Sequence, residues 1–114
     1  MKYLLSILFF AVALWGEPIE VTIIYGNEKP DKVITTDYPK GITALELLKS
    51  VSRVETAQKG KFTFVRSVDG VQSVVGKFGW FYLIDGQSVH KMAQNYVLED
   101  AKTMTWVYKV EACY

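Results

Sequence analysis

Aromatic residues on two expected strands are the side chains of this sequence best suited to binding chemistry. Trp80 and Tyr82 alternate within residues 80–84, and Trp106 and Tyr108 alternate within residues 104–110. Alternate residues of a strand point to one face of a sheet, so these four rings form one cross-strand cluster if the two strands are neighbours. Such a cluster either offers flat apolar faces to a planar ligand or packs as the core, and for Trp106 we favour the core.

A ligand-binding surface is predicted around the first of these strands. Trp80 follows residues 76–79 (GKFG), where two glycines give a tightly turned or mobile approach with little side-chain cover. A tryptophan beside such a loop can present its ring to a ligand. The candidate ligand-binding residues are Phe78, Trp80, Tyr82, His90 and Tyr96. For each of them taken alone, packing or loop closure is the alternative interpretation.

Neither catalysis nor metal binding finds a matching motif. His90 is the only histidine and Cys113 the only cysteine, which excludes an ordinary zinc site and a disulfide within one chain. No nucleophile, base and orienting group form a motif, and residues 76–79 lack the Lys-Ser/Thr of a phosphate-binding loop. We therefore expect a protein that is not an enzyme, with no catalytic residues and no metal site. Cys113 is either a free thiol or a cross-link between two chains.

The composition indicates one domain without a nucleic-acid surface. Half of the 114 residues are apolar, which is typical of a chain that buries a core rather than of a disordered one. The 13 basic and 12 acidic residues nearly cancel. A nucleic-acid binder needs a surplus of Lys and Arg to neutralise phosphates, so this class is excluded.

The N-terminal segment resembles a secretory signal. Lys2 is followed by an apolar run with small residues at Ala11 and Ala13, and Glu17 and Pro18 come too soon for a membrane span. We expect residues 1–16 to be a signal peptide cleaved after Ala13 or Gly16, and residues 17–114 to form a single domain. The mature protein is then periplasmic or secreted, with no stable membrane span after cleavage.

The expected elements are a hairpin, one helix and further strands. Alternation predicts strands at residues 19–25, 32–36, 61–68, 71–75, 80–84 and 104–110, with a hairpin turn at Asp69-Gly70 and a loop at 87–95. Thr43 and Glu46 form a capping box, which predicts an amphipathic helix that ends near Ser52. This order predicts an α+β fold, a β-grasp-like mixed sheet covered by one amphipathic helix.

Three segments together resemble the transcobalamin C-terminal-like domain family. They are the helix entry at 41–48 (GITALELL), the segment 79–86 (GWFYLIDG), and the closing 96–100 (YVLED) with 105–108 (TWVY). The resemblance covers about residues 19–108 and is to bacterial, single-domain, secreted members. In the carriers of this family, cobalamin lies between this domain and a large helical domain.

The resemblance implies an exported, non-catalytic ligand-binding module. Its ligand would be cobalamin, another corrinoid or another planar apolar molecule, held together with a partner protein. The loops around residues 80–84 and 87–95 would face the ligand, and His90 could then ligate cobalt, although solvent exposure is its commoner state. The alternative is an interaction or structural module that pairs through a sheet edge and has no small-molecule ligand.

Overall fold

The computed structural model describes residues 16–110. Residues 1–15, which hold most of the expected signal segment, and residues 111–114, which include Cys113, lie outside the described residues.

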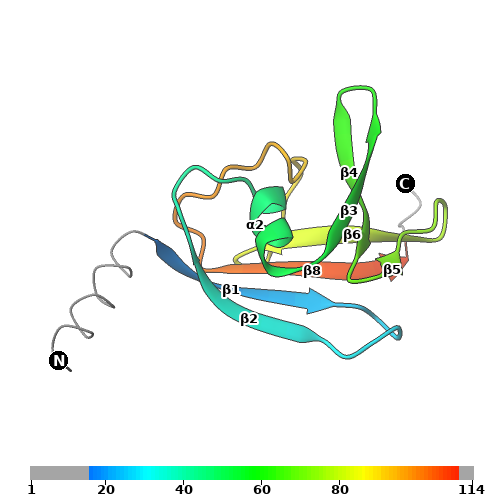
Figure 1. Ribbon diagram of the computed structural model, residues 1–114, viewed down its shortest axis with the longest axis horizontal. Coiled ribbons are helices and arrows are strands. Elements are labelled where there is room, and N and C mark those ends of the chain that lie inside the picture. Colours follow the sequence, from blue (N-terminus) through cyan, green and yellow to red (C-terminus); the bar gives the residue numbers. More distant parts are fainter. Residues whose placement is uncertain (1–15, 111–114) are drawn as a thin grey trace, which may run out of the picture.

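A five-stranded sheet forms the base of the molecule (Figure 1). Its strands lie in the order β2 (Lys32–Tyr38), β1 (Glu17–Ile24), β8 (Thr103–Val110), β6 (Phe78–Ile84) and β7 (Gln87–Ser88). Strands β1 and β8 run parallel, and the other neighbours are antiparallel. Alternate residues of β1 are fully buried, because every second side chain of a strand points to the same face.

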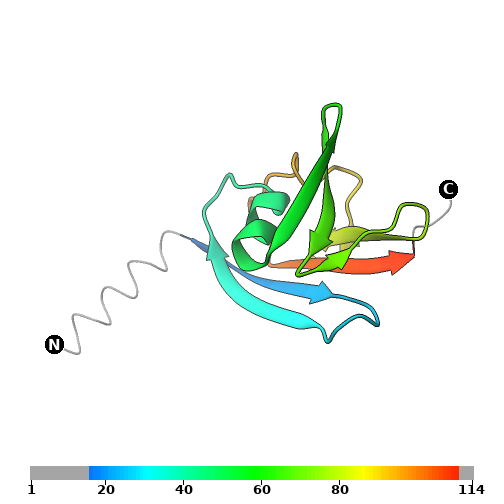
Figure 2. The ribbon, with the colours of Figure 1, turned by 45° about the vertical axis from the view of Figure 1, so that its right-hand side comes forward.

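A second, three-stranded sheet stands away from the first. It consists of β3 (Val54–Lys59), β4 (Phe62–Val68) and β5 (Val71–Gln72). The β3–β4 hairpin projects from the large sheet in both views of the ribbon (Figures 1 and 2). Val65, Val68 and Val71 at the base of this sheet are buried in the common core.

The single helix described, α2 (Ala44–Val51), is short and anchored at its start. The Thr43 hydroxyl accepts from the Glu46 amide and the Glu46 carboxylate accepts from the Thr43 amide, so the predicted capping box is confirmed. Leu45, Leu47 and Leu48 are buried against the core. No helix within residues 16–110 is long and apolar enough to cross a membrane.

The expected α+β, β-grasp-like architecture is wrong. The chain forms two sheets rather than one mixed sheet, and strands make up the greater part of its regular structure. A helix of eight residues is about 12 Å long at 1.5 Å per residue. Five strands spaced by about 4.8 Å span about 19 Å, so two helical turns cannot cover the sheet.

The sequence did not predict the second sheet, because β3 has a weak strand pattern. Ala57, Gln58 and Lys59 are residue types that are depleted in strands. Pairing with the aromatic-rich β4 holds this segment extended. The predicted hairpin turn after β4 is confirmed, because Asp69 and Gly70 both have positive φ, at 50° and 87°.

Candidate ligand-binding site

The predicted cross-strand aromatic cluster is confirmed. Strands β6 and β8 are neighbours, and their register places Trp80 opposite Tyr108 and Tyr82 opposite Trp106. The ring centroids of the first pair are 5.2 Å apart. The second pair is stacked, with centroids 5.0 Å apart and an interplanar angle of 21°. Each such pair contributes roughly 0.5–1.5 kcal/mol beyond the area it buries.

A hollow of about 500 Å³, called here the aromatic pocket, lies beside this cluster. Three parts of the chain form its wall: β6, the segment 63–65 of β4, and the segment 88–93, which begins at the last residue of β7. Leu45 of the helix, with Trp106 and Lys109 of β8, completes the lining. The volume falls within the range of small-molecule sites, and most of the lining is apolar or aromatic, as is usual for such sites.

The structure brings three of the five predicted site residues to the aromatic pocket. Trp80, Tyr82 and His90 line it, whereas Phe78 and Tyr96 do not. Phe78 stacks on Tyr108, with centroids 5.3 Å apart and an interplanar angle of 16°. Tyr96 packs edge-on against Tyr82, with ring centroids 6.2 Å apart, and thus contacts a residue that lines the pocket.

Trp80 is half-buried and held in place by its neighbours. Its indole Nε1 donates a hydrogen bond of 3.0 Å to the Val71 carbonyl oxygen. Tyr25 meets the ring edge-on, with centroids 5.9 Å apart. The ring is therefore oriented before any ligand arrives, which lowers the entropy cost of binding.

Trp106 is in the core, as expected, and also forms part of the pocket wall. Only 2% of its surface is exposed. Its Nε1 is buried and has no hydrogen-bond partner among residues 16–110. Buried polar groups are nearly always paired, so this unpaired donor calls for an explanation.

Tyr82 keeps its proton at ordinary pH. Its hydroxyl donates to the Lys91 carbonyl oxygen. Burial, with a smaller contribution from Tyr96, raises the pKa of Tyr82 to about 12. The tyrosine is therefore a neutral, stacked wall of the pocket rather than a base.

The segment that closes the pocket is tied down at its C-terminal end, at residues 93–96. The Gln94 side chain accepts from the Thr63 amide of β4. The Leu45 amide donates to the Ala93 carbonyl oxygen at 3.1 Å, and the Ala44 amide donates to that of Tyr96 at 2.8 Å. These bonds use amides of the first helical turn, which have no partner within a helix. The pocket is therefore largely formed without a ligand.

Strand β6 presents an open edge to the aromatic pocket. Strand β7 pairs only with Leu83 and Ile84. Phe78 exchanges both backbone hydrogen bonds with Val74, on the side away from β8. Because these directions alternate along a strand, the backbone groups of Trp80 and Tyr82 also point to that side. Within the described chain no hydrogen bond joins them to a partner there.

Sequence reasoning missed the contribution of β4 and α2 to this site. Phe64 and Val65 line the pocket although β4 belongs to the other sheet. Phe64 is 41% exposed, which is unusual for phenylalanine. The alternation of residues 62–68 predicted strand β4. No pattern in the neighbouring sequence indicates that this strand lies beside β6 at the pocket.

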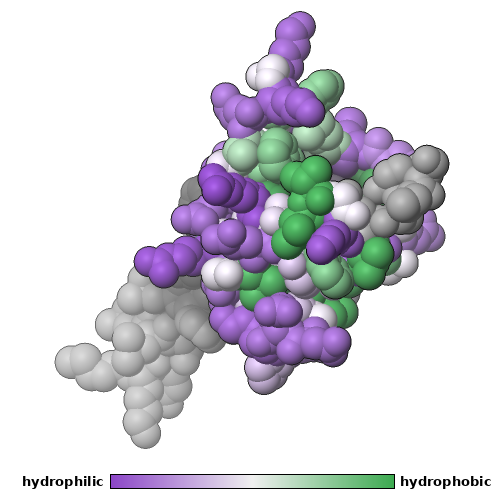
Figure 3. All heavy atoms as spheres, turned by 90° about the vertical axis from the view of Figure 1, so that its right-hand side faces the viewer, coloured by the Kyte–Doolittle hydropathy of each residue, from purple (hydrophilic) through white to green (hydrophobic). Residues whose placement is uncertain are grey.

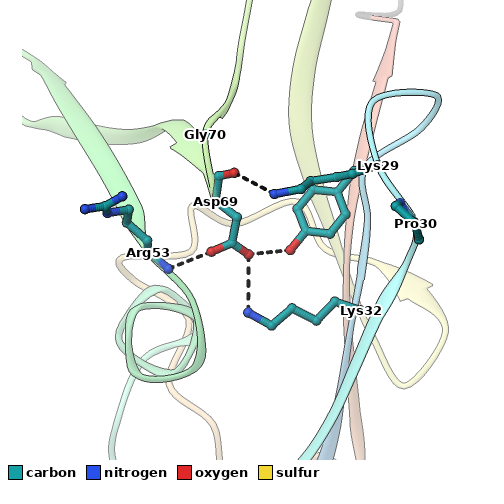
Figure 4. A pocket seen from close by; sticks show the side chains of 7 residues that line it. Lys29, Pro30, Lys32, Arg53, Asp69 and Gly70 are labelled. Atoms are coloured by element: carbon teal, nitrogen blue, oxygen red, sulfur yellow. Dashed lines mark hydrogen bonds and ion pairs between the residues drawn. The ribbon is translucent and has the colours of Figure 1, made fainter.

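A second hollow, of about 580 Å³, surrounds Asp69 in the turn between β4 and β5 (Figure 4). The Asp69 carboxylate accepts from the Tyr25 hydroxyl, from Lys32 Nζ at 3.3 Å and from the Arg53 amide at 3.0 Å. Lys29 Nζ donates to the Asp69 carbonyl oxygen at 3.0 Å. These five residues are called the Asp69 cluster.

The Asp69 cluster is electrostatically satisfied from within. Burial on its own would raise the pKa of the Asp69 carboxyl, but the hydrogen bonds that it accepts, from Tyr25 above all, lower it on balance. Lys32 also donates to the Val51 carbonyl oxygen and to Ser52 Oγ, both at 3.1 Å. The cluster therefore fastens the β1–β2 hairpin to the second sheet.

Apolar side chains are also exposed at the end of the molecule near β5. Val75 is 92% exposed, and Val74 and Phe78 beside it are exposed as well. Figure 3, which faces this end, shows hydrophobic side chains gathered along the middle of the face and bordered by hydrophilic ones. Such a patch is typical of a surface that contacts another protein.

No group of three or more His, Cys, Asp or Glu side chains within residues 16–110 is placed to hold a metal ion. The ionisable side chains that line the aromatic pocket are Tyr82, His90 and Lys109.

Two solved structures share this fold. One is a protein of Ruminococcus gnavus ATCC 29149 for which metal binding has been suggested, with a TM-score of 0.71 and 21% identity over 84% of this chain and 99% of that chain. The other is haptocorrin in complex with Cbi, with a TM-score of 0.72 and 8% identity over 85% of this chain and 26% of that chain. At these identities the likeness concerns the fold, and at that level it supports the resemblance drawn from the sequence.

Residues 41–110 match a family described as a domain of unknown function (DUF4430). The chain belongs to this family. No curated protein matches the sequence.

Proposed function

We propose that this protein is an exported, non-catalytic module that binds a corrinoid or another planar apolar ligand in the aromatic pocket. The observation that carries the proposal is the hollow of about 500 Å³ whose wall includes the stacked Tyr82–Trp106 pair and the oriented Trp80 ring. Flat aromatic faces in a preformed apolar hollow suit a planar ligand. The shared fold with haptocorrin, which was solved with Cbi, makes a corrinoid the first ligand to test.

A partner protein completes the enclosure of the ligand in this proposal. The hollow is open to solvent, and the fold corresponds to only 26% of the haptocorrin chain. The exposed apolar residues Val74, Val75 and Phe78 supply a surface that such a partner could cover.

The proposal assigns the pocket no catalytic step. Within residues 16–110, no hydrogen bond joins His90 to a hydroxyl, thiol or carboxylate that it could activate. Tyr82 holds its proton in a bond to the Lys91 carbonyl oxygen. Covalent catalysis commonly requires a nucleophile that is hydrogen-bonded to a base. The proposal therefore includes no such pair in the pocket.

Titration with cyanocobalamin and with dicyanocobinamide tests the proposal. Tryptophan fluorescence and the corrin absorption band should change together and saturate. Phe64→Ala should weaken binding by about tenfold or more, which is about 1.4 kcal/mol, because Phe64 lines the pocket. Phe62→Ala is the matched control, since Phe62 is an exposed residue of the same strand that does not line the pocket.

An equal loss of affinity in both phenylalanine variants would place the ligand elsewhere and contradict the assigned site. No response of the folded protein to either corrinoid would favour a second candidate function, an interaction module that pairs through a sheet edge. The open edge of β6 at Trp80 and Tyr82 is the observation that favours it, since such an edge can accept an extended segment of another protein.

A further inference from the structure

The aromatic pocket lies at the edge of β6 rather than on one face of the sheet. Trp80, Phe81, Tyr82 and Leu83 all line it, although consecutive residues of a strand point to opposite faces. A single hollow can touch all of them only if it reaches around the edge of the strand. The opposite edge is not available, because β8 pairs with β6 along its whole length.

The backbone of β6 is unpaired along this edge for only a short stretch. At one end, Phe78 exchanges hydrogen bonds of 2.8 and 2.9 Å with Val74. At the other end, β7 pairs with the last two residues of the strand. Residues 79–82 lie between these pairs and span about 13 Å at 3.3 Å per residue. A longer extended segment would meet β7 or the turn before Phe78, so this stretch fits a compact molecule better than a continuous added strand.

Two donors and two acceptors of the backbone face the pocket along this stretch. They are the N–H and C=O groups of Trp80 and of Tyr82, because Gly79 and Phe81 direct theirs towards β8. Within residues 16–110 no hydrogen bond on the pocket side uses these groups. Water can satisfy them while the hollow is open, so a ligand that displaces this water has to replace its hydrogen bonds.

The need for both donors and acceptors restricts the chemistry of the ligand. A carboxamide supplies an N–H donor and a C=O acceptor in one group. An ester or a carboxylate supplies acceptors only, so it would leave the C=O groups of the edge without a donor. A carboxylate would also bring a charge to backbone groups that carry none, and burying an unpaired charge is costly.

We infer that the ligand of the aromatic pocket carries carboxamide groups at the rim of its planar ring system, and that these exchange hydrogen bonds with the backbone of Trp80 and Tyr82. This inference deepens the proposed function and rests on it. The rings of the pocket can bind many planar apolar molecules, whereas the edge of β6 distinguishes those that bear amides. The buried Nε1–H of Trp106 takes no part, because a ligand in the open hollow cannot reach it.

Three planar compounds that share one ring system test the inference on the folded protein. 2-Naphthamide carries the carboxamide, methyl 2-naphthoate the ester and 2-naphthoate the carboxylate. We expect 2-naphthamide to bind at least about fivefold more tightly than either of the others, which is a difference of about 1 kcal/mol. Titrations followed by NMR spectra of the protein measure all three affinities.

Hydrogen exchange of single backbone amides locates the contact. The amides of Trp80 and Tyr82 should exchange fast in the free protein, because they have no partner on the pocket side. At a 2-naphthamide concentration about ten times its Kd they should exchange about tenfold more slowly. The Phe81 amide is the matched control, since it lies between them on the chain but is directed towards β8. It should exchange slowly with and without the compound.

The possible outcomes separate this inference from the proposed function. If the three compounds bind equally well, if the carboxylate binds best, or if the Trp80 and Tyr82 amides stay unprotected, the inference is overturned while the proposed function stands. Protection of these amides in the free protein that grows with protein concentration would show a second copy at the edge, and would likewise overturn it. If neither the naphthalene compounds nor a corrinoid binds the folded protein, both are overturned.

Discussion

Two hollows within residues 16–110 have similar sizes but are lined by side chains of different chemistry. Both gather side chains from distant parts of the chain, with volumes of about 500 Å³ for the aromatic pocket and 580 Å³ for the Asp69 cluster. In the Asp69 cluster the charged groups meet one another. In the aromatic pocket the ring of Tyr82 stacks on that of Trp106, and the buried Trp106 Nε1–H has no hydrogen-bond partner within residues 16–110.

The size of a hollow therefore does not identify a binding site. Groups that already satisfy one another stabilise the fold, because their removal leaves partners unpaired. The rings of the aromatic pocket line a hollow and are therefore available to a ligand. Substitutions in the Asp69 cluster should therefore affect stability, whereas substitutions in the pocket wall, such as Phe64→Ala, should affect binding.

Asp69→Asn is the variant with the largest expected effect on stability. An amide in place of the carboxylate puts a donor against Lys32 Nζ and weakens the bond from Tyr25. The free energy of unfolding should fall by about 2 kcal/mol, and Tm by roughly 10 °C, as measured by urea and thermal unfolding. Asn tolerates the positive φ of this position, so backbone strain does not contribute.

The matched control is Asp85→Asn, in the other Asp-Gly turn, where φ is also positive. Asp85 Oδ1 accepts from the Lys102 and Thr103 amides, which an Asn oxygen can also do. A loss below about 1 kcal/mol is expected. Equal losses in the two variants would mean that the Asp69 cluster fastens nothing beyond its own turn.

The stability of the protein should also depend on pH through Asp69. Its pKa is lower in the folded chain than its ordinary value of 3.8. Between the folded and the ordinary pKa the unfolded chain binds more protons, so stability rises with pH there. The contribution is thus fully present above about pH 5 and is lost as the pH falls through the folded pKa.

Urea unfolding measured at a series of acidic pH values tests this dependence. Asp69→Asn should flatten the acid side of the curve relative to wild type. If the variant and the wild type lose stability in parallel below pH 4, which is about the ordinary pKa of Asp, another carboxylate is responsible.

Tyr82→Phe should have the smallest effect on stability. It removes the hydrogen bond to the Lys91 carbonyl oxygen at an exposed position, which costs at most about 1 kcal/mol. The raised pKa of Tyr82, about 12, means that the folded state holds this proton more tightly than the unfolded chain. Its contribution is therefore present below pH 10, which is about the ordinary value, and is lost as the pH rises towards 12.

The absorbance of tyrosinate, followed during an alkaline titration of the folded protein, measures this pKa directly. The component near 12 should be absent from Tyr82→Phe. A Tyr82 that titrates near 10 instead would show that the pocket wall is solvated, and would weaken the case for a dry aromatic site.

The local predictions from the sequence succeeded where a few residues are enough to fix the geometry. The capping box of Thr43 and Glu46 depends on four successive residues of backbone, and it forms as expected. The turn at Asp69-Gly70 depends on two positive φ angles. The alternation of Trp80 and Tyr82, matched by that of Trp106 and Tyr108, was enough to predict the aromatic cluster once β6 and β8 are neighbours.

The predictions failed where the geometry depends on distant parts of the chain. Residues 54–59 carry no strand pattern of their own, so the second sheet and the wall that β4 gives the pocket were missed. Phe78 shares a strand and a face with Trp80, yet it lies beyond the end of the pocket and stacks on Tyr108 instead.

The sequence by itself determined which side chains share a face, where the helix begins and which turns close hairpins, because these features follow from backbone periodicity and from the φ angles that each residue type allows. Only the tertiary structure decided which edges meet. Tyr25 and Asp69 are 44 residues apart, and Thr63 and Gln94 are 31 apart, yet each pair is joined by a hydrogen bond. Such contacts form because the whole chain buries apolar surface when it folds. The total area buried depends on all the elements together, so it cannot be read from a short segment.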